Sequence, residues 1–146
     1  MKIVVITGSN GLLGQSLVNL LQREKESYKV VGFSRGENRS GRKDFIFEDI
    51  DITNKEKLLN LLDKHQPDVI VNTAAMTNVD QCEVCKEDCD LLNISVVAYL
   101  KEYVSKKKAH LIQLSTDFIF DGLNGPYKET DTPTPISHYG RSKWEA

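Results

Sequence analysis

The stretch that decides the fold is residues 2–14, Lys2-Ile3-Val4-Val5-Ile6-Thr7-Gly8-Ser9-Asn10-Gly11-Leu12-Leu13-Gly14. Its first six residues form a short apolar run rich in β-branched side chains, which predicts a buried strand. Three glycines follow with the spacing Gly-x-x-Gly-x-x-Gly, and an amphipathic helical run comes after them. A strand, a glycine turn and a helix in this order are typical of a dinucleotide-binding turn.

The glycine turn predicts contacts with the pyrophosphate of a dinucleotide cofactor. Gly8 permits the tight turn, Gly11 lets the backbone approach the pyrophosphate, and Gly14 lets the helix pack closely on the strand. The free N–H groups at the start of the helix then face the anion. We therefore expect the cofactor to contact Gly8, Asn10, Gly11, Leu12 and Gly14. The motif is one residue longer than the common Gly-x-Gly-x-x-Gly, and an ordinary glycine-rich turn is the alternative.

Length and composition indicate one globular domain. The chain has 146 residues, of which 40% are hydrophobic and 27% charged, and this is enough to build a core. A formal net charge of -2 argues against a general nucleic-acid binder. No apolar run is long enough to span a membrane, and Met1-Lys2 leads directly into the first strand, so we expect neither a membrane segment nor a signal peptide.

Strand-like and helical patterns alternate along the rest of the chain. Strand-like runs recur at residues 29–34, 45–47, 68–72 and 110–115, and helical patterns lie at about 54–65 and 79–107 and again from 138 onwards. Asn54 is a plausible N-cap for the helix that follows it. This alternation predicts an α/β fold of the Rossmann type, with a doubly wound parallel sheet of about five strands. Ligands bind such a sheet at the carboxyl ends of its strands.

The residues after the second strand bear on the choice of cofactor. Many NAD sites place Asp or Glu about 20 residues after the glycine turn, where the carboxylate bonds the ribose 2′-hydroxyl. Ser34 and Arg35 occupy this region, and a guanidinium suits a 2′-phosphate, so the sequence favours NADP(H). Glu37 leaves NAD(H) possible, and a solvated basic loop is the ordinary alternative.

Two further strand ends predict contacts with the nucleotide. Asp51 and Ile52 follow the third strand, and we expect the carboxylate to meet the adenine amino group while the isoleucine packs on the ring. The fourth strand ends in the small residues of Asn72-Thr73-Ala74-Ala75, which leave room for a nucleotide against the backbone. A plain strand-to-helix turn has the same pattern.

The candidate chemistry lies near the end of the chain. Tyr139 and Lys143 are four residues apart at the start of a helix, so they share one face. Because a nearby ammonium stabilises a phenolate, the pair can donate or take a proton at a carbonyl or an alcohol. That spacing is common by chance. It gains weight from Ser115 and Thr116, two hydroxyls at the end of the fifth strand, where the fold places its ligands.

Together these motifs resemble the extended short-chain dehydrogenase/reductases, and within them the dTDP-4-dehydrorhamnose reductases. The most similar stretches are residues 7–14, 71–80, 114–122, 126–131 and 139–143. The resemblance implies NADP(H)-dependent reduction of a 4-keto nucleotide sugar, with Tyr139 as the proton donor. It implies that Lys143 holds the cofactor ribose and tunes Tyr139, and that Thr116 polarises the sugar carbonyl. It also implies that Thr116 and Asp117 touch the nucleotide-sugar substrate, and that Ala75 and Thr77 line the cofactor.

The resemblance leaves alternatives open. The beta subunit of methionine adenosyltransferase resembles the same family, so a non-catalytic, nucleotide-binding regulatory subunit is one alternative. A nucleotide-sugar epimerase or dehydratase is another. The intact set of Thr116, Tyr139 and Lys143 favours the reductase, with a homodimer as a possible assembly.

Two remaining features concern the extent of the chain and its thiols. Members of the family are about twice as long, so we expect residues 1–146 to be the NAD(P)-binding part of a longer reductase, inactive without its substrate domain. Cys82, Cys85 and Cys89 are odd in number and close in sequence, which favours a reduced, cytoplasmic protein. Because only three thiols are present and the histidines His65 and His110 are distant in sequence, we expect no metal site.

Overall fold

The computed structural model describes all residues, 1–146, and its single sheet has five parallel strands in the order β3-β2-β1-β4-β5. The strands are β1 (Lys2–Thr7), β2 (Tyr28–Ser34), β3 (Ile46–Asp49), β4 (Val69–Asn72) and β5 (His110–Gln113). The predicted α/β fold with a parallel, doubly wound sheet is confirmed. The strand order reverses at β1, and ligands of such sheets bind beside this reversal.

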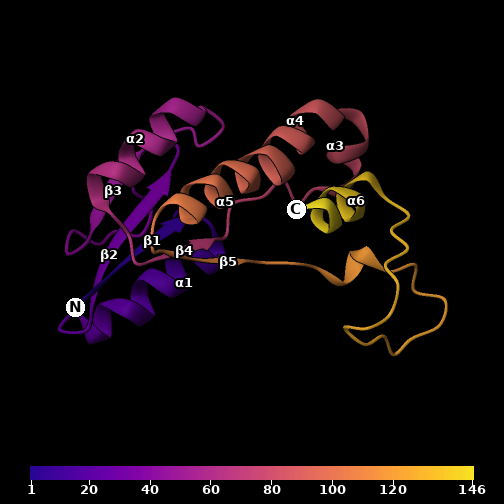
Figure 1. The fold of residues 1–146 in the computed structure, drawn as a ribbon, viewed down its shortest axis with the longest axis horizontal. Coiled ribbons are helices and arrows are strands. Elements are labelled where there is room, and N and C mark those ends of the chain that lie inside the picture. The colour runs from indigo at the N-terminus through magenta and orange to yellow at the C-terminus, as the bar shows by residue number, and fades with distance from the viewer.

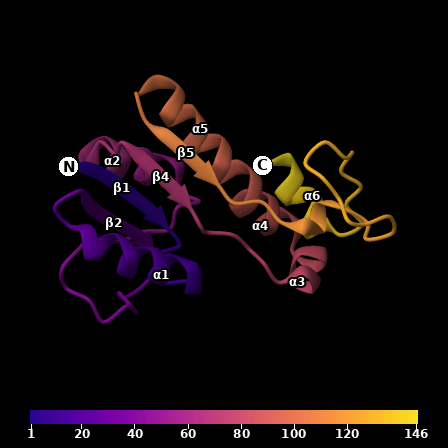
Figure 2. The ribbon, with the colours of Figure 1, turned by 90° about the horizontal axis from the view of Figure 1, so that it is seen from below.

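Helices cover both faces of the sheet, as Figures 1 and 2 show, with α1 on one face and α2 and α5 on the other. Alternate residues of β1 serve the two faces. Val4 and Ile6 pack with Val18 of α1, whereas Val5 packs with Leu58 of α2 and with α5. None of the helices combines the length and apolar character needed to cross a membrane. The helices are α1 (Leu12–Leu21), α2 (Lys55–His65), α3 (Val79–Val84), α4 (Lys86–Asp90), α5 (Val96–Lys106) and α6 (His138–Glu145).

The expected N-cap of α2 is confirmed. The Asn54 side chain accepts a hydrogen bond from the Lys57 backbone N–H at 3.0 Å. The helix ends at His65, and its C-cap Gln66 has a φ of 47°, in the left-handed region. Pro67 then precedes β4. Local capping chemistry therefore sets both ends of this helix.

The helical stretch predicted at about residues 79–107 is present, but it is not one uninterrupted α-helix. The helix breaks at Cys85, where φ is -112° and ψ is 62°, so that α3 ends and α4 begins. A π-helical turn, Leu91–Ser95, then joins α4 to α5 in one continuous helical band (Figure 1). The break lets Cys82 of α3 and Cys89 of α4 both pack on Tyr139 of α6. Because α6 lies much later in the chain, the local pattern gave no sign of this break.

Candidate cofactor and active site

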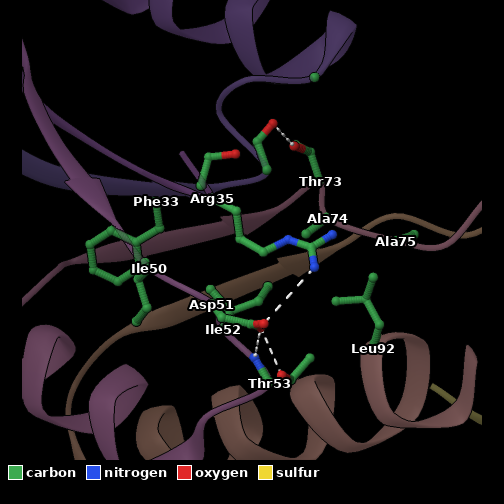
Figure 3. A pocket seen from close by; sticks show the side chains of 13 residues that line it. Phe33, Arg35, Ile50, Asp51, Ile52, Thr53, Thr73, Ala74, Ala75 and Leu92 are labelled. Carbon is green, nitrogen blue, oxygen red and sulfur yellow. Dashed lines mark hydrogen bonds and ion pairs between the residues drawn. The ribbon is translucent and has the colours of Figure 1, made fainter. Parts of the chain in front are cut away.

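A cavity of about 230 Å³ opens at the carboxyl ends of the strands, and we call it the glycine-turn cavity (Figure 3). Many of the predicted cofactor residues meet here, although they come from four separate strand ends. The lining residues are Gly8, Gly11, Phe33, Ser34, Arg35, Ile50, Asp51, Ile52, Thr53, Thr73, Ala74, Ala75 and Leu92. The parallel sheet brings these strand ends to one edge, and this explains why the fold collects them.

The backbone around Gly8 and Gly14 leaves no room for a side chain at either position. Gly8 has a φ of +68°, and a Cβ placed on it would lie 2.9 Å from the Ala74 backbone nitrogen. A Cβ on Gly14 would lie 2.3 Å from the Gly8 carbonyl oxygen, so α1 packs directly on the turn. The first turn of α1 has no side-chain cap and no acidic residue. Its free N–H groups can therefore donate hydrogen bonds to an anion, and this geometry fits the pyrophosphate of a dinucleotide.

Asn10 and Leu12 do not line the cavity. The Asn10 Nδ2 donates to the carbonyl oxygens of Arg35 and Glu37 at 3.2 and 2.9 Å, and its Oδ1 accepts from the Arg39 N–H at 2.9 Å. Asn10 thus holds the basic loop after β2 against the glycine turn. The Leu12 side chain is 90% exposed at the start of α1. Contact of either residue with the cofactor stays a prediction.

One cation and one anion face each other across the mouth of the cavity. The Arg35 guanidinium extends toward Asp51, with Nη1 3.9 Å from Oδ2 (Figure 3). Hydrogen bonds from the Thr53 hydroxyl and N–H, at 2.7 and 3.0 Å, hold the pKa of Asp51 below its ordinary value, with a smaller contribution from Arg35. Asp51 is therefore a carboxylate near neutral pH, and it can accept hydrogen bonds from an amino group.

The apolar wall of the cavity includes residues that the sequence did not single out. Phe33 and Ile50 are buried, and both lie beside strand ends that the sequence predicts, so the strand pattern contains a signal for them. Leu92 comes from the π-helical turn, far along the chain. The helical periodicity of residues 79–107 gave no signal for Leu92, because Leu92 reaches the cavity only where the helical band packs on the core of the sheet.

Lys143 and Tyr139 are both buried on α6, beside the end of β5. The Ser137 hydroxyl caps this helix by accepting from the Gly140 N–H at 3.0 Å. Lys143 is 7% exposed, and its Nζ donates to the Leu114 carbonyl oxygen at 2.6 Å. Burial lowers the pKa of Lys143. The Tyr139 ring meets Phe118 edge-on, with 5.7 Å between the ring centroids.

The predicted substrate residues lie on the turn that α6 contacts. Thr116 precedes a 3-10 turn, Asp117–Ile119, and its hydroxyl accepts from the Phe118 N–H at 3.3 Å. The same hydroxyl lies 3.2 Å from an Asp117 carboxylate oxygen, to which it can donate. A Cβ on Gly140 would stand 2.2 Å from the Phe118 carbonyl oxygen, so the backbones of helix and turn touch directly. The structure therefore places Thr116, Asp117, Tyr139 and Lys143 in one neighbourhood.

Asn93 is a buried polar residue that sequence reasoning missed. It is 1% exposed in the π-helical turn, a rare element that is frequent at functional sites. Its Nδ2 donates to the Ser142 hydroxyl at 2.9 Å and to the Met76 carbonyl at 3.1 Å, while its Oδ1 accepts from the Met76 N–H at 2.8 Å. Asn93 thus ties the segment before Thr77 to α6. Thr77 itself is exposed and lies outside the glycine-turn cavity.

The three cysteines are free and do not gather into one cluster. Cys82 and Cys89 are buried, and burial, with a contribution from Cys89, raises the pKa of Cys82 to about 12. A protonated thiol of this kind packs as a small apolar side chain. The structure instead brings Cys89 near Asp90 and His138, where the imidazole Nε2 lies 2.7 Å from the Asp90 carboxylate. This pair joins α4 to the start of α6.

Comparisons with known proteins agree with this arrangement. A family model described as RmlD substrate binding domain matches residues 1–146. A dTDP-4-dehydrorhamnose reductase of Aggregatibacter actinomycetemcomitans is 37% identical over 143 residues, which cover 97% of this chain and 44% of that protein. The methionine adenosyltransferase 2 subunit beta of Rattus norvegicus is 33% identical over 140 residues, which cover 96% of this chain and 40% of that protein.

A solved structure extends the similarity to the fold. The crystal structure of a hypothetical dTDP-4-dehydrorhamnose reductase from Sulfolobus tokodaii matches with a TM-score of 0.86 and 36% identity. The match covers 99% of this chain and 50% of that one. The chain thus spans about half the length of the relatives that it matches.

Proposed function

The chain belongs to the RmlD substrate binding domain family, and from this premise we propose that its protein is an NADP(H)-dependent reductase of a 4-keto nucleotide sugar. The proposed reaction converts dTDP-4-dehydrorhamnose to dTDP-rhamnose, and residues 1–146 form the dinucleotide-binding domain. One observation carries the proposal. The glycine-turn cavity and the buried pair Tyr139 and Lys143 lie along the same carboxyl edge of one parallel sheet.

In the proposed mechanism, the bound nicotinamide cofactor supplies the hydride that reduces C4 of the sugar. Tyr139 donates its phenolic proton to the C4 oxygen, which becomes the product hydroxyl. The buried Lys143 ammonium stabilises the tyrosinate that remains and donates hydrogen bonds to the cofactor ribose. Thr116 donates a hydrogen bond to the C4 oxygen and polarises the carbonyl, and Asp117 contacts the substrate.

The preference for NADP(H) is assigned to the loop after β2. Arg35 places a guanidinium at the mouth of the cavity, and Ser34 adds a hydroxyl beside it. Both groups can bind a 2′-phosphate. On the opposite side, Asp51 is proposed to accept from the adenine amino group while Ile52 packs on the ring.

Three free cysteines fit a reducing, cytoplasmic environment.

A second candidate is a non-catalytic, nucleotide-binding subunit. The observation that favours it is the 33% identity to the methionine adenosyltransferase 2 subunit beta. A reductase must release a proton from Tyr139 in each turnover, whereas a regulatory subunit needs only the cofactor cavity. The two candidates therefore differ in what they require of a single hydroxyl group.

The deciding experiment is the substitution Tyr139→Phe in the protein that carries this chain. We expect kcat for dTDP-4-dehydrorhamnose to fall by about 10²-fold or more, the range of a lost general acid, with the Kd for NADPH nearly unchanged. Loss of NADPH absorbance follows the reaction, and Tyr99→Phe, on α5, is the matched control. Full activity in Tyr139→Phe would refute the assignment. NADPH binding without turnover of the sugar by the unsubstituted protein would favour the regulatory subunit.

A further inference from the structure

Three polar side chains form a hydrogen-bonded row across the sheet, and the proposed chemistry makes no use of them. Thr7 of β1, Asn72 of β4 and Gln113 of β5 are direct register partners. The Thr7 hydroxyl donates to the Asn72 Oδ1, and the Asn72 Nδ2 donates to the Gln113 Oε1 at 2.7 Å. Thr7 and Asn72 are buried, at 0% and 1% exposure. The row therefore links the strand that enters the glycine turn to the edge strand β5.

The row ends at a backbone carbonyl that Lys143 also uses. The Gln113 Nε2 donates to the Leu114 oxygen at 3.1 Å, and the Lys143 Nζ donates to the same oxygen at 2.6 Å. A carbonyl can only accept, so Gln113 must turn its amide nitrogen toward Leu114 and its oxygen toward Asn72. The direction of every hydrogen bond in the row follows from this one carbonyl.

The position of the Lys143 ammonium depends on this carbonyl. Lys143 is buried, and its ammonium is held by a hydrogen bond to the Leu114 carbonyl oxygen. An ammonium has three donors, so two remain for other partners. Leu114 follows the last residue of β5, and its carbonyl lies beyond the paired part of the strand. Gln113 is the side chain that holds this carbonyl from the side of the sheet.

We propose that Gln113 is the positioning residue for Lys143, because it fixes the Leu114 carbonyl, and through it the ammonium, relative to the glycine turn. The inference rests on the proposed cofactor-binding function. The Gln113 amide is engaged by Asn72 and by the Leu114 carbonyl, so we assign it a role through Lys143 and not through contact with the cofactor. Through Asn72, the row connects Gln113 to Thr7, which directly precedes Gly8. Hydrogen bonds thereby connect the glycine turn to the Lys143 side of the proposed cofactor site.

The test is a double-mutant cycle on NADPH binding in the protein that carries this chain. Gln113→Leu keeps a similar size and removes both hydrogen bonds. We expect the Kd for NADPH to rise about tenfold, equivalent to roughly 1.4 kcal/mol. In a Lys143→Met background the same substitution should change the Kd by less than about twofold, since the ammonium that it positions is gone. Gln113→Glu, which cannot donate to Leu114 when ionised, should weaken binding as Gln113→Leu does.

The outcomes separate this proposal from the proposed function. Asn60→Leu, an amide removed from the exposed surface of α2, is the control and should leave the Kd unchanged. An equal loss in both backgrounds would mean that Gln113 only supports the sheet, and it would overturn the proposal. So would an unchanged Kd in Gln113→Leu. Absence of NADPH binding by the unsubstituted protein would overturn the proposed function, and this proposal with it.

Discussion

Replacing Gly140 with alanine tests how closely α6 is seated on the backbone after β5. A Cβ at this position would stand 2.2 Å from the Phe118 carbonyl oxygen, and real Cβ atoms essentially never come closer than 3.0 Å to such an atom. The helix and the turn must therefore separate by about 0.8 Å, the difference between these two distances. The Pro135 Cβ, 3.2 Å from the added Cβ, prevents the helix from relieving this clash by a lateral shift.

Two opposing effects set the stability of Gly140→Ala. Alanine favours a helix over glycine by about 1 kcal/mol, whereas overpacking against a fixed backbone costs about 1–3 kcal/mol. We expect a net destabilisation of up to about 2 kcal/mol. The effect on activity should be larger, because Tyr139 and Lys143 flank the substituted position. A displacement near 1 Å costs on the order of 10²-fold in rate.

The assay compares kcat for dTDP-4-dehydrorhamnose and the free energy of unfolding in denaturant for Gly140→Ala and Arg141→Ala. Arg141 is exposed at the next position of α6, so its substitution should leave both quantities almost unchanged. A Gly140→Ala protein that is more stable than the parent and equally active would refute the reasoning. It would mean that α6 does not rest on the Phe118 backbone and that the placement of Tyr139 is wrong.

Arg35→Ala should lower the preference for NADPH over NADH by about tenfold, roughly the loss of one hydrogen bond to a charged group. Calorimetric titration with both cofactors measures this preference, and Arg39→Ala, on the same loop but outside the cavity, is the control. An unchanged preference in Arg35→Ala would contradict the role of Arg35. Burial lowers the pKa of Lys143, so the folded state is destabilised by the charged form of this side chain. This cost to the free energy of unfolding is complete at pH values below the lowered pKa, and it vanishes above the ordinary lysine pKa of about 10.4. Lys143→Met should therefore increase the free energy of unfolding more at about pH 7 than at about pH 10.5, and it should weaken NADPH binding. The same increase at both pH values would show that the gain in stability does not come from removing a buried charge.

The sequence by itself determined the elements that depend on neighbouring residues. The apolar run before Gly8 specified a buried strand, and the Asn54 side chain specified the start of α2, since strand burial and helix capping act within a few residues. Alternation of these elements was enough to predict the parallel sheet. The rule that ligands bind at carboxyl strand ends then pointed to Arg35, Asp51 and Ala74, and these three residues line the glycine-turn cavity.

The tertiary structure alone decided which polar groups pair across the sheet and where the long helix breaks. Asn10 reaches the loop after β2, Asn93 reaches α6, and Gln113 reaches Asn72, in each case across many intervening residues. The break at Cys85 likewise goes together with the packing of Cys82 and Cys89 on Tyr139 of α6. Such contacts arise only when strand register and helix packing bring distant residues together, so no local pattern encodes them. The residues that carry the proposed chemistry could be recognised in the sequence, whereas those that hold them in place could not.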